Sequence, residues 1–221
     1  MCVDLAAWDV RAEALGGTSY TLGAAFAAKL GQLIGRCRAD DGLVTVQLPV
    51  NERTENDTRA NAMSFAQVSL DPTVLTTDLR DARSAIRDAL RRTRETADSS
   101  LQVAWLASFL PKKTLRRMDE NMVADPNCPV FYSNLGDAGS FVNRVDGTAA
   151  EYLTARVLAQ QETRTSLERI GGQMTLQSSR LPDSFVMSVN AYQPGFENTR
   201  SALRELAADA LAEFGLTGEV Y

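Results

Sequence analysis

The chain of 221 residues contains no histidine. This absence excludes a Ser-His-Asp triad, a Cys-His dyad and most zinc sites, because each of these arrangements needs an imidazole. The sequence also has no CxxC pair and no phosphate-binding P-loop. For a reaction that needs a general base, the chain offers carboxylates, and an ordinary carboxylate is a poor base for an alcohol.

Cysteines, long apolar stretches and an excess of positive charge are also scarce or absent, and each of these excludes a class of protein. The three cysteines (Cys2, Cys37 and Cys128) follow no pairing pattern, so we expect free thiols in a cytoplasmic protein. No apolar stretch reaches the roughly 18 residues that a membrane span needs, and the start of the chain lacks the pattern of a secretory signal. The net charge of −5 argues against a nucleic-acid surface.

The composition that remains is that of a globular protein. Hydrophobic residues make up 44% and charged residues 23% of a length that fits one domain or one half of a two-lobed protein. Hydrophobic periodicity predicts strands over 43–50, 60–70, 129–136, 151–160, 173–180 and 184–192, and helices over 4–15, 20–38, 78–95, 113–122 and 197–214. Met1 is expected to lead directly into the first helix, and 161–172 into a loop or short helix. The fold class is therefore α/β in the broad sense: an α+β two-layer sandwich with a mixed sheet of about six strands covered by helices.

Polar residues follow the strand predicted at 43–50. Pro49 fixes its backbone and ends strand pairing, and Asn51 and Arg53 come directly after it. Their side chains are able to bind a carbonyl, a phosphate or another chain. The alternative is structural, with Arg53 holding its own loop. The neighbouring acids are expected to be solvated, so we predict no metal site.

A second polar group ends the strand "PVFYSNLG", in the stretch "SNLGD" at 133–137. Ser133 and Asn134 would place a hydroxyl and an amide beside a reacting carbonyl oxygen, and Gly136 would let the backbone come close. In the alternative, Asn134 caps its own turn. A further cluster, the arginines of 80–94, is interleaved with acids and indicates the solvated face of a helix.

In order, "LGGTSYTL", a small-residue helix, "VTVQLPVNERTENDTRANAMSF", an Arg-rich helix and "PVFYSNLGDAG" resemble the C-terminal half of a chloramphenicol-acetyltransferase-like acyltransferase. "LGGTSYTL" is similar to the "LGxTxND" helix start of wax ester synthases, and "YSNLG" to a strand shared with condensation domains. Relatives in this superfamily include condensation domains, wax ester synthase–diacylglycerol acyltransferases and polyketide-associated acyltransferases. The resemblance spans nearly the whole chain and implies one C-terminal lobe over 1–221.

The resemblance implies where the chemistry lies. Its catalytic HHxxxDG motif belongs to an N-terminal lobe that this chain does not include, so no catalytic residue is expected here and the chain alone should be inactive. Ser133 and Asn134 would face the tunnel between the lobes, and Asn51, Arg53 and Asn61 would contact the donor or acceptor. The loop that bridges the lobes would be 136–150 or 161–172.

The resemblance also implies the partners. The N-terminal lobe of the same polypeptide and an acyl-CoA or acyl carrier protein are expected. Coenzyme A thioester is the co-substrate and no other cofactor is implied. Transfer to a hydroxyl of a lipid or natural product is favoured over amide formation, because no "DFGWG"-like stretch of condensation domains is present. A non-catalytic binding protein that associates as a homodimer, and peripheral contact with a membrane, stay open as alternatives.

Overall fold

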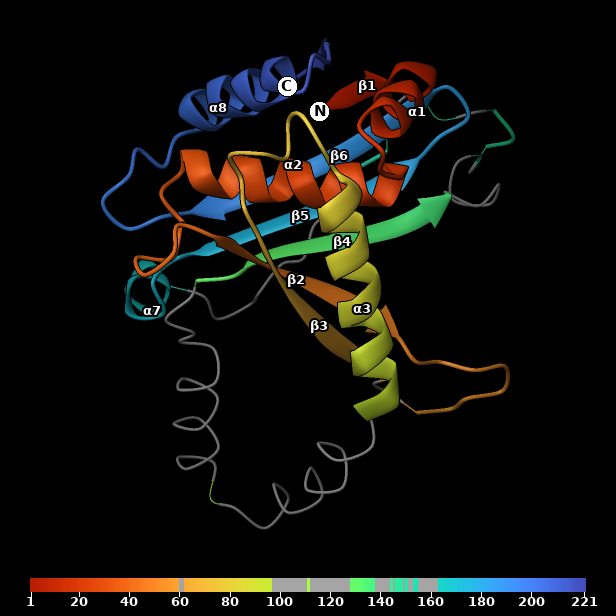
Figure 1. Cartoon of the computed structure of the whole chain (residues 1–221), viewed down its shortest axis with the longest axis horizontal. Coiled ribbons are helices and arrows are strands. Elements are labelled where there is room, and N and C mark those ends of the chain that lie inside the picture. The colour runs from red at the N-terminus through yellow and green to blue at the C-terminus, as the bar shows by residue number, and fades with distance from the viewer. Residues whose placement is uncertain are drawn as a thin grey trace.

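The computed structural model describes residues 1–59, 62–96, 128–137 and 163–221, with a few isolated positions between 111 and 154. Within these residues the chain folds into helices packed on a sheet (Figure 1). The elements, in chain order, are β1 (Cys2–Asp4), α1 (Leu5–Ala14), α2 (Ser19–Leu33), β2 (Val44–Asn51), β3 (Met63–Leu70), α3 (Arg80–Thr96), β4 (Val130–Asp137), α7 (Arg164–Arg169), β5 (Gln173–Arg180), β6 (Ser184–Tyr192), α8 (Arg200–Glu213) and β7 (Gly218–Glu219).

The strands form one seven-stranded sheet in the order β3-β2-β4-β5-β6-β1-β7. β4 lies between two parallel neighbours, β2 and β5, whereas the remaining pairs are antiparallel. The predicted mixed sheet covered by helices is therefore confirmed. Of the strands predicted from periodicity, that over 151–160 falls on residues of which the structure describes only 153 and 154.

Two short strands were outside the prediction, and both lie at the ends of the chain. β1 pairs with β6 and with β7, so the first and last strands are neighbours. The expectation that Met1 leads directly into a helix is wrong, because Cys2–Asp4 pair in the sheet before α1 begins. Strands of two or three residues leave too short a pattern for periodicity to detect.

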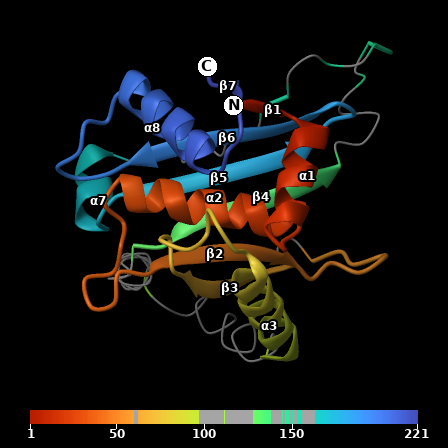
Figure 2. The same ribbon diagram turned by 45° about the horizontal axis from the view of Figure 1, so that its top comes forward.

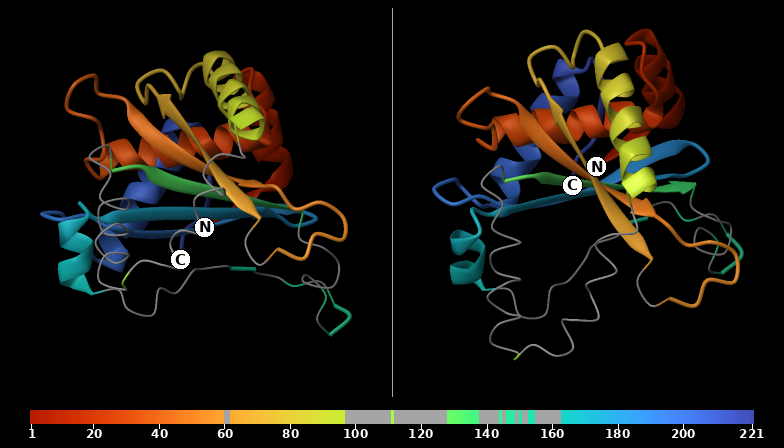
Figure 3. Two further views of the ribbon diagram at one scale, coloured as in Figure 1. Left: turned by 90° about the horizontal axis from the view of Figure 1, so that it is seen from below. Right: turned by 60° about the horizontal axis from the view of Figure 1, so that its bottom comes forward.

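The helices are arranged around α2. In Figure 2, α2 lies across the sheet with α1 and α8 on one side of it and α3 on the other, and the left view of Figure 3 shows α1 and α3 above strands β4 and β5. Their buried side chains form one core with alternate strand residues such as Val46, Tyr132 and Leu176. We call the face that carries these residues the helix-covered face. The side chains between them in sequence, such as Gln47, Phe131 and Gln177, belong to the opposite face.

Small residues allow α2 to pack closely on the sheet. A Cβ added at Gly23 would collide with the phenol ring of Tyr132, and one at Gly31 would come within 2.8 Å of a methyl group of Val130. The alanines of α2, from Ala24 to Ala28, are fully buried. The small residues therefore bring the backbone of α2 close to the strands.

Side-chain caps fix where the first two helices begin. The Asp4 carboxylate accepts from the Ala7 backbone N–H at 2.8 Å, and the Thr18 hydroxyl accepts from the Thr21 N–H at 3.2 Å. Gly16 has φ of +77° in the turn between the two helices, a conformation that favours glycine. These residues set the boundaries of α1 and α2.

The remaining predictions of helices divide into three outcomes. The helices expected over 78–95 and 197–214 are α3 and α8. The segment 161–172, for which loop and helix were both open, contains α7, whose capping box is formed by Thr163 and Ser166. The helix expected over 113–122 lies outside the described residues.

Candidate functional site

The loop after β2 is held by its own arginine. The Arg53 guanidinium donates to the backbone carbonyls of Asp57 at 2.9 Å and Arg59 at 3.0 Å. The Asn51 side-chain oxygen accepts from the Arg53 backbone N–H at 2.9 Å. These contacts agree with the structural alternative for Arg53. The Arg53 guanidinium bonds within its own loop, and the exposed Asn51 side chain holds the first turn of that loop.

An ion pair also stabilises the same loop. The Arg59 guanidinium donates to the Asp57 carboxylate, with its Nη2 lying 2.7 Å from Oδ2. Hydrogen bonds from the Arg59 side chain and backbone lower the pKa of Asp57 to about 2. The carboxylate is therefore ionised at any physiological pH and closes the loop on itself.

The polar residues at the end of β4 have two different environments. The Asn134 side-chain oxygen accepts from the Gly136 backbone N–H at 2.8 Å, so this residue caps its own turn, as in the alternative prediction. Gly136 has φ of +72°, and the pairing of β4 with β5 shifts register between Asn134 and Asp137. Ser133 is half-buried and stands opposite Gln177 of β5.

The structure brings the two polar segments to one edge and one face of the sheet. β2 and β4 are parallel, with Gln47 opposite Phe131, so the carboxyl ends of both strands lie at the same edge. By alternation, Asn51 and Ser133 belong to the opposite face. Beyond the paired positions the strands diverge (Figure 1). Each segment is held by internal hydrogen bonds, and the fifth predicted residue, Asn61, lies outside the described residues.

Two further residues of the opposite face were missed from the sequence. The Gln177 side-chain oxygen and the Thr45 hydroxyl are buried and have no hydrogen-bond partner among the residues that the structure describes. A buried polar atom without a partner costs free energy, so a native protein retains it where a ligand or another segment supplies the bond. The signal in the sequence is weak: both are polar residues at the outward positions of strands.

Aromatic residues stand beside these polar groups. The rings of Phe65 on β3 and Phe131 on β4 lie 6.0 Å apart, and Phe65 is 46% exposed. Ser133, Gln177 and Thr45 thus belong to a face that combines apolar rings with polar groups, of which the Gln177 oxygen and the Thr45 hydroxyl have no partner in the described part of the chain. Sites for small organic ligands have this mixture of apolar surface and a few polar contacts.

A hydrogen bond on the helix-covered face holds β4 in place. The Tyr132 hydroxyl is hydrogen-bonded to the Ser178 hydroxyl at 2.9 Å, and both residues are buried. Burial raises the pKa of Tyr132 far above its ordinary range, so the phenol stays protonated. Since Tyr132 precedes Ser133, this bond holds the strand from which Ser133 projects.

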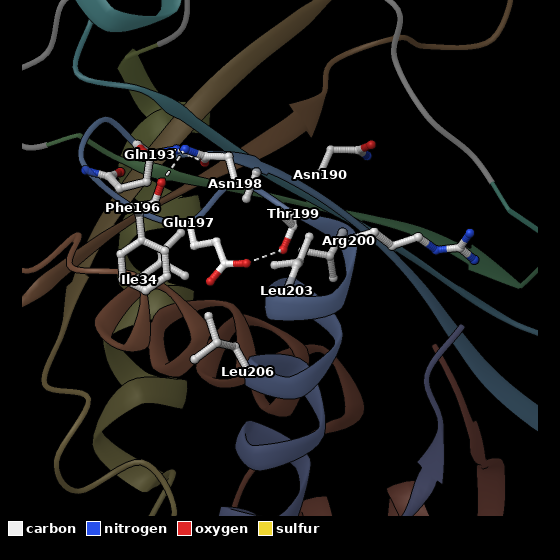
Figure 4. A pocket seen from close by; sticks show the side chains of 12 residues that line it. Ile34, Asn190, Gln193, Phe196, Glu197, Asn198, Thr199, Arg200, Leu203 and Leu206 are labelled. Carbon is white, nitrogen blue, oxygen red and sulfur yellow. Dashed lines mark hydrogen bonds between the residues drawn. The ribbon is translucent and has the colours of Figure 1, made fainter.

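A separate cavity of about 240 Å³ lies where α2 ends and α8 begins (Figure 4). Its polar groups serve the loop after β6: the Asn198 amide donates to the carbonyls of Gln193 at 2.8 Å and Phe196 at 2.9 Å, and the Thr199 hydroxyl donates to Glu197 at 3.0 Å. Its walls include Leu203 and other apolar side chains. Several polar groups of this cavity are thus bonded to each other, which favours a structural role.

The described part of the chain has neither a metal-binding cluster nor a membrane-spanning helix. Its residues hold no group of three or more histidine, cysteine or acidic side chains placed to bind a metal ion. Nor does any described helix have the length and apolar character to cross a membrane. The cysteines Cys2, Cys37 and Cys128 are free.

Comparison with known proteins gives one informative similarity. No family model and no curated protein matches the chain. Among solved structures, the chain is similar to a "PapA2 acyl transferase", with a TM-score of 0.53 and 10% sequence identity over 97% of its own length. At this identity the likeness establishes a shared fold, and the acyltransferase-type fold expected from the sequence is confirmed.

The extent of the match is unequal in the two proteins. The chain spans 44% of the length of the PapA2 acyl transferase chain, so it corresponds to less than half of that structure. The branch of acyltransferases named from the sequence motifs stays a prediction, as do the donor and acceptor.

Proposed function

We propose that this chain is one lobe of an acyltransferase and supplies the wall of the acyl-transfer site that does not carry the general base. The observation that carries the proposal is the fold match over 97% of this chain but 44% of the PapA2 acyl transferase chain, in a sequence without histidine. The acyl group comes from acyl-CoA or an acyl carrier protein and passes to a hydroxyl. The histidine-bearing HHxxxDG lobe of the same polypeptide completes the site.

The opposite face of the sheet is the surface we assign to this role. Ser133, Gln177 and Thr45 offer hydrogen-bonding groups there, and those of Gln177 and Thr45 have no partner among the residues described; the rings of Phe65 and Phe131 belong to the same face. A donor side chain such as the Ser133 hydroxyl stabilises negative charge on the carbonyl oxygen as the tetrahedral intermediate forms. The aromatic rings provide an apolar surface for the acyl chain.

The polar loop at the edge of the sheet has a supporting role in this proposal. Arg53 and Asn51 hold the turn after β2 through bonds within the loop, so they shape the rim instead of contacting the reacting carbonyl. Asn61 stays a predicted contact to donor or acceptor. Asn134 fixes the turn that follows Ser133.

Proton transfer must come from outside this chain. A base has to lie within about 2.6–3.2 Å of the acceptor hydroxyl, and its pKa should be near the working pH. Asp137, at the end of β4, is the acid closest in sequence to Ser133, but its carboxylate lies 3.4 Å from the Arg180 guanidinium. A carboxylate is in any case a poor base for an alcohol.

The test compares the chain alone with the longer polypeptide that includes the proposed HHxxxDG lobe. Thiol release from a series of acyl-CoAs, with and without a long-chain alcohol, measures transfer. We expect no transfer by the chain alone and transfer by the longer protein. Acyl transfer by the chain alone would contradict the assignment of one lobe.

A serine substitution tests the assigned face within the longer protein. Ser133→Ala should lower kcat/KM about tenfold or more, because one donor to the oxyanion is lost. Ser201→Ala, at an exposed serine of α8, is the matched control and should leave kcat/KM unchanged. Equal effects of the two changes would remove Ser133 from the site.

A non-catalytic binding lobe is the second candidate, and the absence of histidine favours it. In that case the opposite face binds a ligand or a second copy of the chain without turnover. A longer polypeptide that lacks an HHxxxDG motif and shows no transfer would support this candidate.

A further inference from the structure

A groove of about 530 Å³ lies between the start of α2 and the side of α3. Arg83, Arg87, Arg91 and Arg94 line it from α3, together with Glu95. Figures 1 and 2 show α3 beginning beside the N-terminal end of α2 and running away from it. The groove is thus lined by four cationic side chains and one acidic side chain.

The spacing of the arginines puts them in a single row. Positions separated by three or four residues lie on the same side of a helix, and Arg83 to Arg94 spans about 16 Å at 1.5 Å per residue. The sequence predicts a solvated face here, and the four side chains are exposed as expected. What the sequence does not predict is that the row faces a hollow against another helix.

Acidic partners offset only part of this charge. Asp88 lies 3.3 Å from the Arg91 guanidinium and 4.0 Å from that of Arg87. Among the described residues, Arg83 and Arg94 have no ion pair. Cations near the C-terminal end of a helix are favourable, which accounts for Arg94, but Arg83 lies in the first turns of α3, where a positive charge is unfavourable.

The other wall of the groove also favours an anion. It is formed by the first turn of α2, with Thr18, Tyr20 and Thr21, and a helix N-terminus carries partial positive charge. Burial raises the pKa of Tyr20 to about 12, so its hydroxyl stays protonated and is able to donate. Ile86, which is buried, and Leu90 supply an apolar floor.

From this arrangement we infer that the groove binds a soluble small molecule bearing at least two phosphate groups. Guanidinium groups match phosphate oxygens in geometry as well as charge, and the row is long enough for several phosphates. The volume is that of a small-ligand site. The chain carries a net charge of −5, which would repel a broad acidic protein surface, whereas a small polyanion experiences mainly the charges within about 8 Å.

This inference does not depend on the proposed acyl transfer, which uses the opposite face of the sheet. The two also have separate readouts: the groove is tested by binding to the chain alone, and acyl transfer by turnover in the longer protein. Failure of one leaves the other intact.

The experiment titrates the chain with inorganic tripolyphosphate by calorimetry at low and at high salt. We expect binding at one site that weakens as salt increases. Arg83→Gln and Arg87→Gln should each weaken it about tenfold, the effect of losing one charge-assisted hydrogen bond. Tyr20→Phe, on the other wall, should weaken it by a few-fold.

The matched control is Arg92→Gln, on the same helix but outside the lining of the groove. It should bind as the unchanged protein does, and thermal unfolding should show that all variants are folded. Absence of binding, an equal loss in Arg92→Gln, or no loss in Arg83→Gln and Arg87→Gln would overturn the inference. Binding to vesicles with phosphoinositide headgroups but not to tripolyphosphate would also overturn it, because the source would then be a membrane.

Discussion

The two faces of the sheet use polar side chains in different ways. On the helix-covered face, the buried Tyr132 and Ser178 satisfy each other, and glycine stands where the phenol needs room. On the opposite face, the Gln177 side-chain oxygen and the Thr45 hydroxyl are buried without a partner among the described residues. The division is clearest in β4 and β5, because the helix-covered face also has a buried hydroxyl without a described partner, that of Ser64 on β3. In β4 and β5, a side chain that serves stability stands next to one that is available for binding.

This difference separates stability from function at neighbouring positions. Tyr132 and Ser133 are adjacent in β4, yet the first is part of the core and the second is half-buried on the other face. A substitution on the helix-covered face should therefore lower the free energy of unfolding, whereas one on the opposite face should not lower it. The following predictions test this separation in order of decreasing effect on stability.

The largest effect is expected at Gly23. A methyl group there would overlap the ring of Tyr132, and a close-packed interface between helix and sheet has no space to absorb it. Gly23→Ala should lower the free energy of unfolding by about 1–3 kcal/mol, as overpacked cores do. Urea denaturation measures this change. Gly35→Asn, in a turn where an added Cβ meets nothing within 4 Å, is the control and should cost less.

A smaller effect of opposite sign is expected at Gln177. The buried oxygen of this amide has no partner among the described residues, so an apolar side chain of similar shape removes an unpaired acceptor. Gln177→Met should raise the free energy of unfolding by about 1 kcal/mol, while lowering acyl transfer in the longer protein. Gln173→Met, at an exposed position of the same strand and face, should change neither. A destabilised Gln177→Met would mean that the amide has a structural partner.

Arg53→Ala should act locally. It removes two hydrogen bonds within the loop after β2, so amide hydrogen exchange over residues 52–59 should become about tenfold faster, while global stability changes by less than about 0.5 kcal/mol. Glu55→Ala, an exposed residue of the same loop, is the control. Unchanged exchange in Arg53→Ala would show that Arg59 alone holds the loop.

The smallest expected effect on stability is the protonation of Asp57 at low pH. The pKa of Asp57 is lowered from 3.8 to about 2 by the Arg59 hydrogen bonds, so its contribution to loop stability is complete above pH 4 and is lost as pH falls through 2. A carboxyl NMR titration should give a midpoint near 2. In Arg59→Gln the midpoint should return towards 3.8. A midpoint that stays near 2 in the variant would assign the shift to another group.

The sequence predicts the framework of this fold because its signals are local. Asp4 and Thr18 cap their helices where capping residues stand before apolar periodicity, and the ranges 173–180 and 184–192 match β5 and β6. β1 and β7 could not be predicted, because their pairing depends on residues more than two hundred positions apart along the chain.

The candidate site was predicted less well, for a physical reason. The roles of Asn51, Arg53 and Asn134 as caps and loop anchors depend on which carbonyl or N–H lies nearby, and the sequence left both readings open. Gln177 was missed because an unpaired buried oxygen is a property of its surroundings and not of its residue type. The same holds for the arginines of α3, whose groove exists only because α2 begins beside them.

The pairing of β1 with β6 and β7 sets an order for folding during synthesis. Among the described strands β1 is made first, and its partners at Ser184–Tyr192 and Gly218–Glu219 are made last. The core around α2 also depends on a residue that is made late, because Phe26 packs on Phe214. Contacts this distant along the chain form slowly. Apolar surface and unpaired strand edges therefore stay exposed on the nascent chain until α8 and β7 have been made, and such surfaces are the ones that chaperones bind and that aggregate.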